Sequence, residues 1–151
     1  MTRTRYRLYV TYELDRVSSL ARAEASKIYM RECGLDIRAL RVLRCVAENP
    51  GLSVTEVVEA TMFERTLVSK LITELVAKGL LLRRIASADA RQFEIDITAE
   101  GLRKADIADE LGDRLNEDLL SCLEPNEREV FAKCLKRLVQ WRPKSAEPST
   151  S

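Results

Sequence analysis

The sequence predicts a mainly helical protein with one small β-hairpin, and three observations support this fold class. Charged residues make up 32% of the 151-residue chain and aromatic residues 5%, which is typical of a helical protein with ion pairs on its surface. Apolar residues recur at the helical period in several segments, most clearly between Thr66 and Gly79. Two short apolar runs around a polar tip follow that segment, as in a hairpin. An amphipathic helix that leads into a hairpin is the arrangement of a winged helix-turn-helix.

The first helix is expected from about Tyr9 to Cys33. Gly34 should end it, because a residue without a Cβ adopts the left-handed conformation at low cost. Residues 1–8 hold three arginines and no acid, so they are expected to be an extended arm, either a solvated tail or a contact to phosphate or a partner. Four tyrosines lie beside this helix: Tyr6, Tyr9, Tyr12 and Tyr29. They are interpreted as a packed interface, with a pocket for an aromatic ligand as the alternative.

Local signals predict a helix-turn-helix in the next segment. Asp36 is placed to cap a second helix, and residues 49–51 (Asn-Pro-Gly) break it. Ser53 and Glu56 have the S-x-x-E spacing of a capping box, which predicts the start of a short third helix. The turn over residues 60–65 then leads into the helix that begins near Thr66. Two helices joined by a short turn, the second with an exposed polar face, form a helix-turn-helix.

The helix from Thr66 has two different faces. Its apolar stripe predicts packing on a core and consists of Val68, Leu71, Ile72, Leu75 and Val76. Its polar face is suited to base edges and phosphates and consists of Thr66, Ser69, Lys70 and Thr73. Gly79 should stop the helix. A surface helix that is merely packed in an α-rich domain is the alternative interpretation.

The rest of the chain predicts a hairpin and two further helices. Residues 80–85 read as one strand, and the alternation of residues 93–97 indicates a second, half-buried strand. Thr98 is expected to cap a long helix that runs to about Leu123, and Pro125 to occupy the first position of a last helix. Residues 142–151 are expected to be a disordered tail.

The first helix and the last two carry apolar stripes that one small core cannot bury, which predicts a two-fold homodimer. A monomeric bundle is the alternative. The expected dimerisation residues are Leu14, Val17, Leu119, Phe131, Leu135, Leu138 and Trp141. The expected organisation is an arm and dimerisation helix over 1–34, a winged helix-turn-helix DNA-binding domain over 35–98, C-terminal dimerisation helices over 99–141, and the tail over 142–151.

Charge is segregated although the net charge is only +1. Residues 65–91 hold six cations and two anions, an excess of +4, and residues 106–118 hold six anions and one cation, an excess of −5. One end can therefore approach phosphate while the other stays acidic. The chain has no histidine and no Cys-x-x-Cys pair, so no metal site, cofactor or catalytic constellation is expected, and the protein is not expected to be an enzyme. Without an apolar leader or membrane span, a cytoplasmic location with reduced thiols is expected.

Three stretches together resemble the MarR family of bacterial transcription regulators, over about residues 8–141. GLDIRALRVLRCV (34–46) is similar to the family's segment G-L-t-x-x-q-f-x-v-L, and TLVSKLITELVAKGLLLRR (66–84) to its recognition helix. ADARQFEIDITAEG (88–101) is similar to its D-R-R wing, which runs into L-T-x-x-G. The resemblance implies a winged helix-turn-helix that binds double-stranded DNA as a homodimer.

The resemblance also implies roles for individual residues. The recognition-helix residues at the major groove would be Arg65, Thr66, Leu67, Ser69 and Lys70. Arg91 would enter the minor groove with Asp89 orienting it, and Arg83 and Arg84, like Lys70, would hold phosphates. Three positions depart from the family pattern: Met62 replaces a common turn glycine, Glu64 a Ser or Asp cap, and Ala90 the first wing arginine.

The resulting hypothesis is a repressor on a pseudo-palindromic operator, released by a small, aromatic ligand. One alternative is a redox-sensing regulator. For this role Cys33, beside Arg31 at a helix end, is the candidate for a lowered thiol pKa, whereas Cys45, Cys122 and Cys134 sit among apolar residues and are interpreted as packing thiols. The other alternative is a winged-helix protein-interaction module that does not bind DNA.

Overall fold

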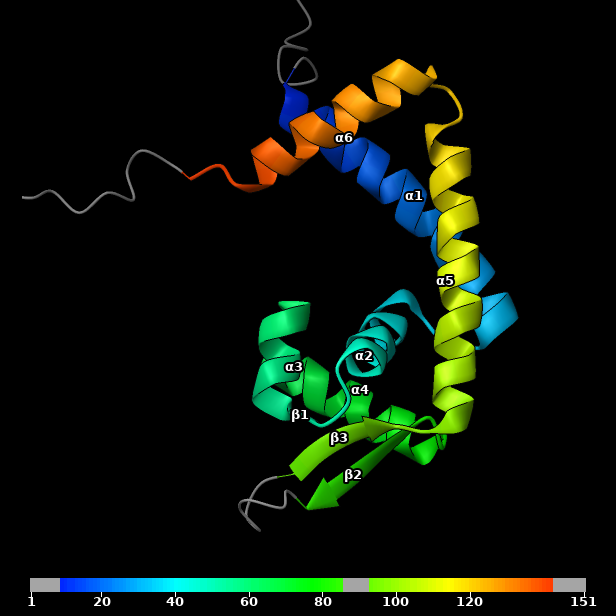
Figure 1. The fold of residues 1–151 in the computed structure, drawn as a ribbon, viewed down its shortest axis with the longest axis vertical. Helices are drawn as coiled ribbons and strands as arrows, with labels where there is room; N and C mark the ends of the chain where they lie inside the picture. Colours follow the sequence, from blue (N-terminus) through cyan, green and yellow to red (C-terminus); the bar gives the residue numbers. More distant parts are fainter. Residues whose placement is uncertain (1–8, 86–92, 143–151) are drawn as a thin grey trace, which may run out of the picture. The chain divides into compact units, whose positions relative to one another are not determined.

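A computed structural model describes residues 9–85 and 93–142 of the chain (Figure 1). The described residues form six helices and three short strands. In chain order these are α1 (Val10–Cys33), α2 (Ile37–Glu48), β1 (Leu52–Ser53), α3 (Val54–Thr61), α4 (Arg65–Ala77), β2 (Leu81–Ile85), β3 (Phe93–Ile97), α5 (Ala99–Leu120) and α6 (Pro125–Val139). The predicted fold class, mainly helical with a small β-hairpin, is confirmed.

The chain divides into two compact units, Met1–Leu115 and Asn116–Ser151. The first unit contains α1 through β3 and most of α5, and the second contains the end of α5 and α6. The functional boundaries expected from the sequence stay a prediction.

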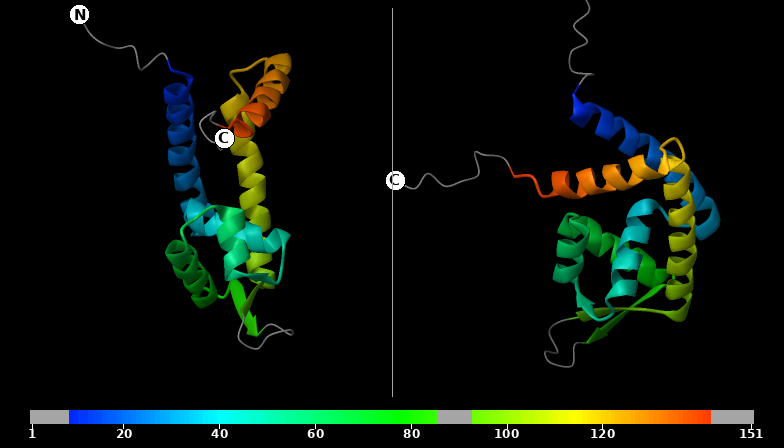
Figure 2. Two further views of the ribbon diagram at one scale, coloured as in Figure 1. Left: turned by 90° about the vertical axis from the view of Figure 1, so that its left-hand side faces the viewer. Right: turned by 45° about the horizontal axis from the view of Figure 1, so that its top comes forward.

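The core of the first unit is built around α2, α3 and α4, which pack on one another in both views of Figure 2. Its central side chains are fully buried and are contributed by all three helices and the sheet. They include Leu40, Leu43, Val57, Val68, Ile72, Leu75, Leu81 and Ile95. The apolar stripes of the helix-turn-helix segment therefore meet in one hydrophobic core.

Local end signals act as predicted at four helix boundaries. Gly34 adopts a left-handed conformation (φ 66°) after α1, and the Asp36 carboxylate accepts hydrogen bonds from two backbone N–H groups at the start of α2. At the start of α3, Ser53 and Glu56 form the capping box, and hydrogen bonds from Ser53 lower the pKa of the Glu56 carboxyl. Gly79 (φ 71°) follows α4.

The sheet has one strand more than the sequence indicates. Its order is β1-β3-β2, and all pairs are antiparallel, with Leu81 opposite Ile97 and Leu52 opposite Ile95. β1 has only two residues, too few for a period of alternation, and its partner lies more than forty positions away, so only the folded chain reveals it. The predicted alternation holds at Ile95, which is fully buried, but Phe93, on the same apolar side of the pattern, is exposed.

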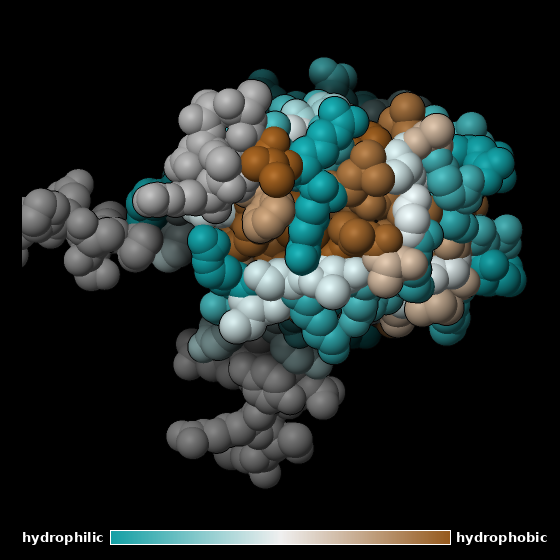
Figure 3. All heavy atoms as spheres, turned by 90° about the horizontal axis from the view of Figure 1, so that it is seen from below, coloured by the Kyte–Doolittle hydropathy of each residue, from teal (hydrophilic) through white to brown (hydrophobic). Residues whose placement is uncertain are grey.

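The face seen from below in Figure 3 combines apolar surface with charged side chains. The exposed apolar residues of the hairpin are Leu82, Ile85 and Phe93, and Leu102 is exposed near the start of α5. Residues 86–92 connect the two strands and lie outside the described part of the chain.

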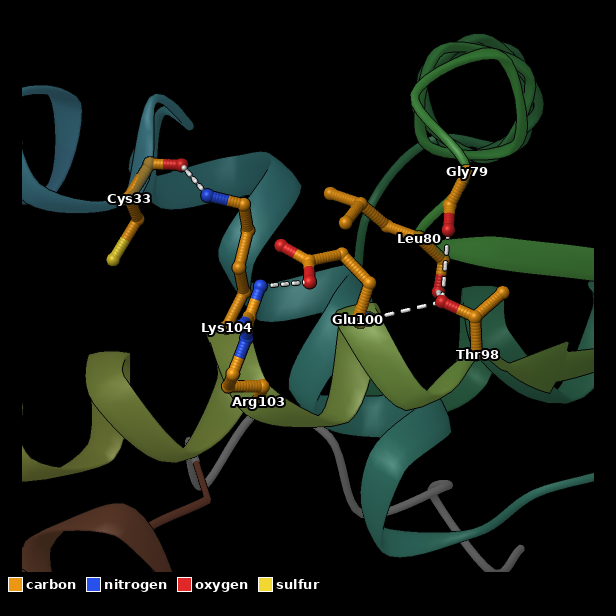
Figure 4. Close-up of polar contacts among 8 residues, drawn as sticks. Cys33, Gly79, Leu80, Thr98, Glu100, Arg103 and Lys104 are labelled. Carbon is orange, nitrogen blue, oxygen red and sulfur yellow. Dashed lines mark hydrogen bonds and ion pairs between the residues drawn. The ribbon is translucent and has the colours of Figure 1, made fainter.

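The start of α5 is fixed by a close approach to β2 (Figure 4). Thr98 Oγ1 accepts a hydrogen bond from Gly101 N at 2.9 Å and lies 2.8 Å from the Gly79 carbonyl oxygen. One turn later, Lys104 Nζ donates to the Cys33 carbonyl oxygen at 2.9 Å, which joins α5 to the end of α1. Thr98 is thus the cap that the sequence predicts. The helix ends at Leu120 rather than near Leu123, because the next residues form turns.

In the second unit, α6 begins with Pro125 in the first turn, as predicted, and the Glu127 side chain accepts from Glu124 N at 2.9 Å. Arg128 bonds to the Leu123 carbonyl oxygen and to Glu117. No residue of α6 is buried within the chain.

Within residues 9–85 and 93–142, no helix combines the length and the apolar character that crossing a membrane requires.

Candidate nucleic-acid interface

Helix α4 separates its apolar and polar side chains as the sequence predicts. Val68, Leu71, Ile72 and Leu75 are buried. The opposite face, which consists of Thr66, Ser69, Lys70 and Thr73, is exposed. We call these four residues the polar face of α4. It offers hydroxyl groups and one ammonium group, and those of Thr66, Ser69 and Lys70 can reach base edges and phosphates.

Leu67 is partly buried, and its contact with the major groove stays a prediction. Its side chain packs against the hydrophobic core of the first unit. The resemblance placed this residue at the major groove, but its side chain is held partly by the core because it flanks the buried stripe of α4.

The turn before α4 has two unusual residues. Met62 adopts a left-handed conformation (φ 57°) and ends α3, at the position where the family pattern has a glycine. Glu64 is the N-cap residue of α4, and its side chain makes no capping hydrogen bond. Both observations agree with the departures noted in the sequence, since Glu is a poor cap and Met is strained at positive φ.

A threonine hydroxyl on α3 holds Arg65, the first residue of α4. Its guanidinium donates to Thr55 Oγ1, with Nη2 at 2.9 Å and Nη1 at 3.3 Å. A neutral acceptor leaves the charge of the arginine intact, so Arg65 stays available to an external anion.

A second arginine–threonine pair joins the hairpin to α4. Arg83 Nη2 donates to Thr73 Oγ1 at 2.8 Å, and the same hydroxyl donates to the Ser69 carbonyl oxygen at 2.8 Å. The threonine therefore uses its donor within α4 and its acceptor toward β2. This link brings Arg83 beside the polar face of α4.

Arg84, the next residue of β2, has a different environment. Successive side chains of a strand point to opposite faces of the sheet, so Arg84 lies on the face opposite Arg83. Its Nε forms an ion pair with the Asp96 carboxylate at 2.9 Å. On α4, Lys70 Nζ lies 3.9 Å from Glu74. The structure thus separates two arginines that the sequence treats alike.

Asp89 and Arg91, the predicted wing contact, lie outside the described residues, as does Ala90. Their insertion into a minor groove stays a prediction.

The cysteines differ from their expected environments. Cys33 is buried, and burial raises the pKa of its thiol although the cations Lys104 and Arg44 act in the opposite direction. The expected lowering is therefore wrong. Cys45 is half-buried with a raised pKa, but Cys122 and Cys134 are exposed within the chain, so their interpretation as packed thiols is also wrong. Apolar neighbours in the sequence do not bury a cysteine when the surface on which it lies packs against no other part of the described chain.

The sequence did not predict a junction of α1, α2 and α5. Arg44 on α2 lies over the ring of the buried Tyr29 of α1, with 5.4 Å from Cζ to the ring centroid. Its guanidinium also bonds to the Ala108 carbonyl oxygen and pairs with Asp109 on α5, with 2.6 Å from Nε to Oδ1. The sequence indicates this junction only through the position of Arg44, a charged residue directly after the buried Leu43. Tyr29 is packed, as predicted, whereas Tyr9 is exposed and Tyr6 lies outside the described residues.

A helix-turn-helix, a following antiparallel hairpin and an exposed polar face on the second helix together define a winged helix-turn-helix protein. A family model described as the MarR family matches residues 34–92. The transcriptional regulator HosA of Escherichia coli O127:H6 is 26% identical over 98 residues, which cover 65% of this chain and 73% of HosA. Residues 34–92 therefore carry the sequence pattern of the MarR family, and the chain is similar to transcriptional regulators of that family.

Solved structures share the fold. One is BpsR of Bordetella bronchiseptica, whose DNA binding is regulated by 6-hydroxynicotinic acid. It has a TM-score of 0.81 at 20% identity, and the match covers 91% of this chain and 97% of BpsR. Another is the Mycobacterium tuberculosis MarR family protein Rv2887 in complex with salicylic acid, with a TM-score of 0.71 at 23% identity, covering 86% of this chain and 96% of Rv2887.

Proposed function

We propose that this protein is a transcriptional regulator of the MarR type, a repressor that binds a pseudo-palindromic operator as a homodimer. The observation that carries the proposal is the polar face of α4, which stands exposed between Arg65 and Arg83, two arginines with no described carboxylate partner. Packing of α4 on the core does not require two cations without a described carboxylate partner beside a row of hydroxyl groups. An anionic duplex supplies their counter-charge.

In the proposed complex each protomer inserts α4 into the major groove, and the two copies occupy grooves about 34–36 Å apart. Thr66, Ser69 and Lys70 read base edges and phosphates. Arg91, oriented by Asp89, enters the flanking minor groove, where a narrow A·T-rich groove concentrates negative potential.

The effector is proposed to be a small aromatic carboxylic acid. This class is supported by the similar proteins BpsR, which 6-hydroxynicotinic acid regulates, and Rv2887, which was crystallised with salicylic acid. Effector binding would favour a spacing of the two recognition helices that does not fit the operator, and by linkage DNA would weaken effector binding by the same factor.

We further propose a cytoplasmic location and no catalytic activity. Regulation through oxidation of Cys33 is disfavoured, because the thiolate is the reactive form and burial raises the thiol pKa.

The test is fluorescence anisotropy of the purified protein on a labelled duplex from upstream of its own gene, beside a scrambled duplex of equal composition. We expect affinity in the nanomolar range, a steep negative salt dependence, and at least about 1000-fold preference for the upstream duplex. Arg91→Ala should weaken binding by about 1–3 kcal/mol. Equal binding to both duplexes would refute sequence-specific regulation, and the absence of any binding would favour the interaction-module alternative.

The effector is tested on the same complex by titration with 6-hydroxynicotinate and salicylate, with benzyl alcohol as an uncharged aromatic control. We expect the acids to release DNA and the alcohol to have no effect. Release by the alcohol alone, or by none of the three, would contradict the proposed class.

A further inference from the structure

We propose that Thr55 and Thr73 are positioning residues, which hold Arg65 and Arg83 as two phosphate-binding cations on either side of the polar face of α4. The inference rests on the proposed DNA binding. It specifies which cations contact the phosphate backbone of DNA and which side chains orient those cations. It also assigns Arg84, a neighbour of equal charge, no role in DNA binding.

The two pairs share one arrangement. In each pair an arginine bonds to a threonine hydroxyl of a neighbouring element, α3 for Arg65 and α4 for Arg83. Because a guanidinium has five N–H donors and each pair uses only one or two of them, the others have no hydrogen-bond partner that the structure describes. A hydroxyl group orients the arginine side chain and leaves its charge uncompensated. A carboxylate would orient the side chain and also neutralise its charge.

Arg84 shows the contrast within the same strand. Its ion pair with Asp96 at 2.9 Å provides a carboxylate, and the strand alternation turns it away from α4. A phosphate would have to displace that carboxylate, so the free energy gained from a phosphate contact is largely cancelled.

The two anchors stand toward opposite ends of the polar face of α4. Arg65 and Thr73, the residue that holds Arg83, are eight positions apart on α4, which corresponds to about 12 Å along a helix axis. When the polar face lies in a major groove, the two arginines therefore reach different phosphates.

Binding to a random-sequence duplex across a potassium chloride series tests this inference, because phosphate contacts do not depend on sequence. Arg83→Ala should weaken binding about ten-fold and make the slope of log K against log salt less steep by about one unit per protomer. Arg65→Ala should behave in the same way. Arg84→Ala, which removes the same charge, should stay within about two-fold of the wild type with an unchanged slope.

A double-mutant cycle tests the role of Thr73. Thr73→Val keeps the shape of the side chain and should weaken binding about three-fold, whereas Thr73→Ser keeps the hydroxyl and should bind like the wild type. If the threonine acts through the arginine, Thr73→Val has no further effect in an Arg83→Ala background. Thr55→Val and Arg65→Ala form the matching cycle. Melting temperatures should stay unchanged, since all four side chains are exposed.

The outcomes separate this inference from the proposed function. Wild-type binding to the upstream duplex, combined with equal salt slopes for Arg83→Ala and Arg84→Ala, would overturn the inference alone. If the effects of Thr73→Val and Arg83→Ala on binding free energy were additive, Thr73 would not act through Arg83, and its positioning role would be refuted. Failure of the wild type to bind any duplex would overturn the proposed function and this inference together.

Discussion

At the residue scale, Gly101 has the strictest steric requirement among the five glycines of the chain. A Cβ at this position would overlap the Leu80 carbonyl oxygen and lie 2.9 Å from Ile97 Cγ1. Backbone atoms cannot yield as the end of a side chain can, so Gly101→Ala should separate α5 from β2. We expect a loss of about 1–3 kcal/mol in the free energy of unfolding, measured by urea denaturation, although alanine is the better helix former.

Gly112, in the same helix, provides the control. Its added Cβ would meet only side-chain ends, Tyr29 Oη at 3.1 Å and Arg44 Nη2 at 3.2 Å. Gly112→Ala should therefore cost less than Gly101→Ala, because alanine gains up to about 1 kcal/mol from helix propensity. Equal losses at both positions would contradict the steric account.

The cysteines give a prediction about pH. Because burial raises the pKa of Cys33, little thiolate forms at mildly alkaline pH, and iodoacetamide should modify the exposed Cys122 first. The neutral thiol also stabilises the folded state. That stability is fully present below the pKa of the unfolded thiol and is lost as the pH rises through the higher folded value.

Peptide mass spectrometry after a short iodoacetamide pulse measures the order of modification. Cys33→Ser removes the thiol and should flatten the alkaline fall in stability, which thermal melts across the pH range would detect. Modification of Cys33 before Cys122 would show that the thiol is not protected by burial.

Single residues explain why some local features could be predicted from sequence and others could not. Asp36, Ser53 and Thr98 cap helices within three residues of themselves, so their spacing contains the whole signal. The Arg83–Thr73 bond joins residues of different elements, and the hydroxyl that receives it could equally have bonded to water. The ion pair between Arg84 and Asp96 forms because of the register in which β2 and β3 pair. That register could not be predicted from the sequence alone.

At the element scale, the turn between α3 and α4 determines where the polar face of α4 begins. Met62 holds a left-handed conformation there, and its side chain is 87% exposed, so it gains little from packing. Left-handed backbone costs a residue with a Cβ about 1–2 kcal/mol, whereas glycine costs about 0.4–1 kcal/mol through the entropy of the unfolded chain. Met62→Gly should therefore stabilise the protein by about 0.5–1 kcal/mol.

Thermal and urea denaturation measure that gain, with Met62→Ala as the control, which keeps the Cβ and should not stabilise. DNA affinity should remain within about two-fold of the wild type, because Met62 does not belong to the polar face of α4. If the glycine variant were less stable than the wild type, the Met62 side chain would have to pack against a second molecule, and the strain argument would be wrong.

Helices and strands were predicted correctly wherever a long segment has periodic apolar residues. Every buried residue of α4 belongs to the apolar stripe predicted from the sequence, and the hairpin strands differ from the predicted ranges by at most one residue. β1 could not be predicted because two residues carry no period. The junction at Arg44 requires three helices to meet, and no one helix contains that information.

At the scale of the whole molecule, α6 has no buried residue among those that the structure describes, and several of its apolar side chains are exposed. Leu138 is 53% exposed and Val139 79%, and Trp141, which follows the helix, is 69% exposed. Exposed apolar side chains also occur along α1 and include Leu14, Val17 and Leu20. Apolar faces of this length are costly in water, and a second copy of the chain offers matching faces.

The proposed dimer predicts that a charge at Leu138 separates the protomers. Each dimer of Leu138→Asp would bury two unpaired carboxylates, so its dissociation constant should rise at least about 100-fold in sedimentation equilibrium. DNA affinity should fall with it, since one protomer binds only one half-site. Lys136→Asp introduces the same residue on the opposite side of α6 and should remain dimeric. The melting transition of the first unit should not change in either variant, because α6 buries no residue within the chain. A dimeric Leu138→Asp protein with normal DNA affinity would exclude this face of α6 from the dimer interface and leave α1 as the remaining apolar candidate.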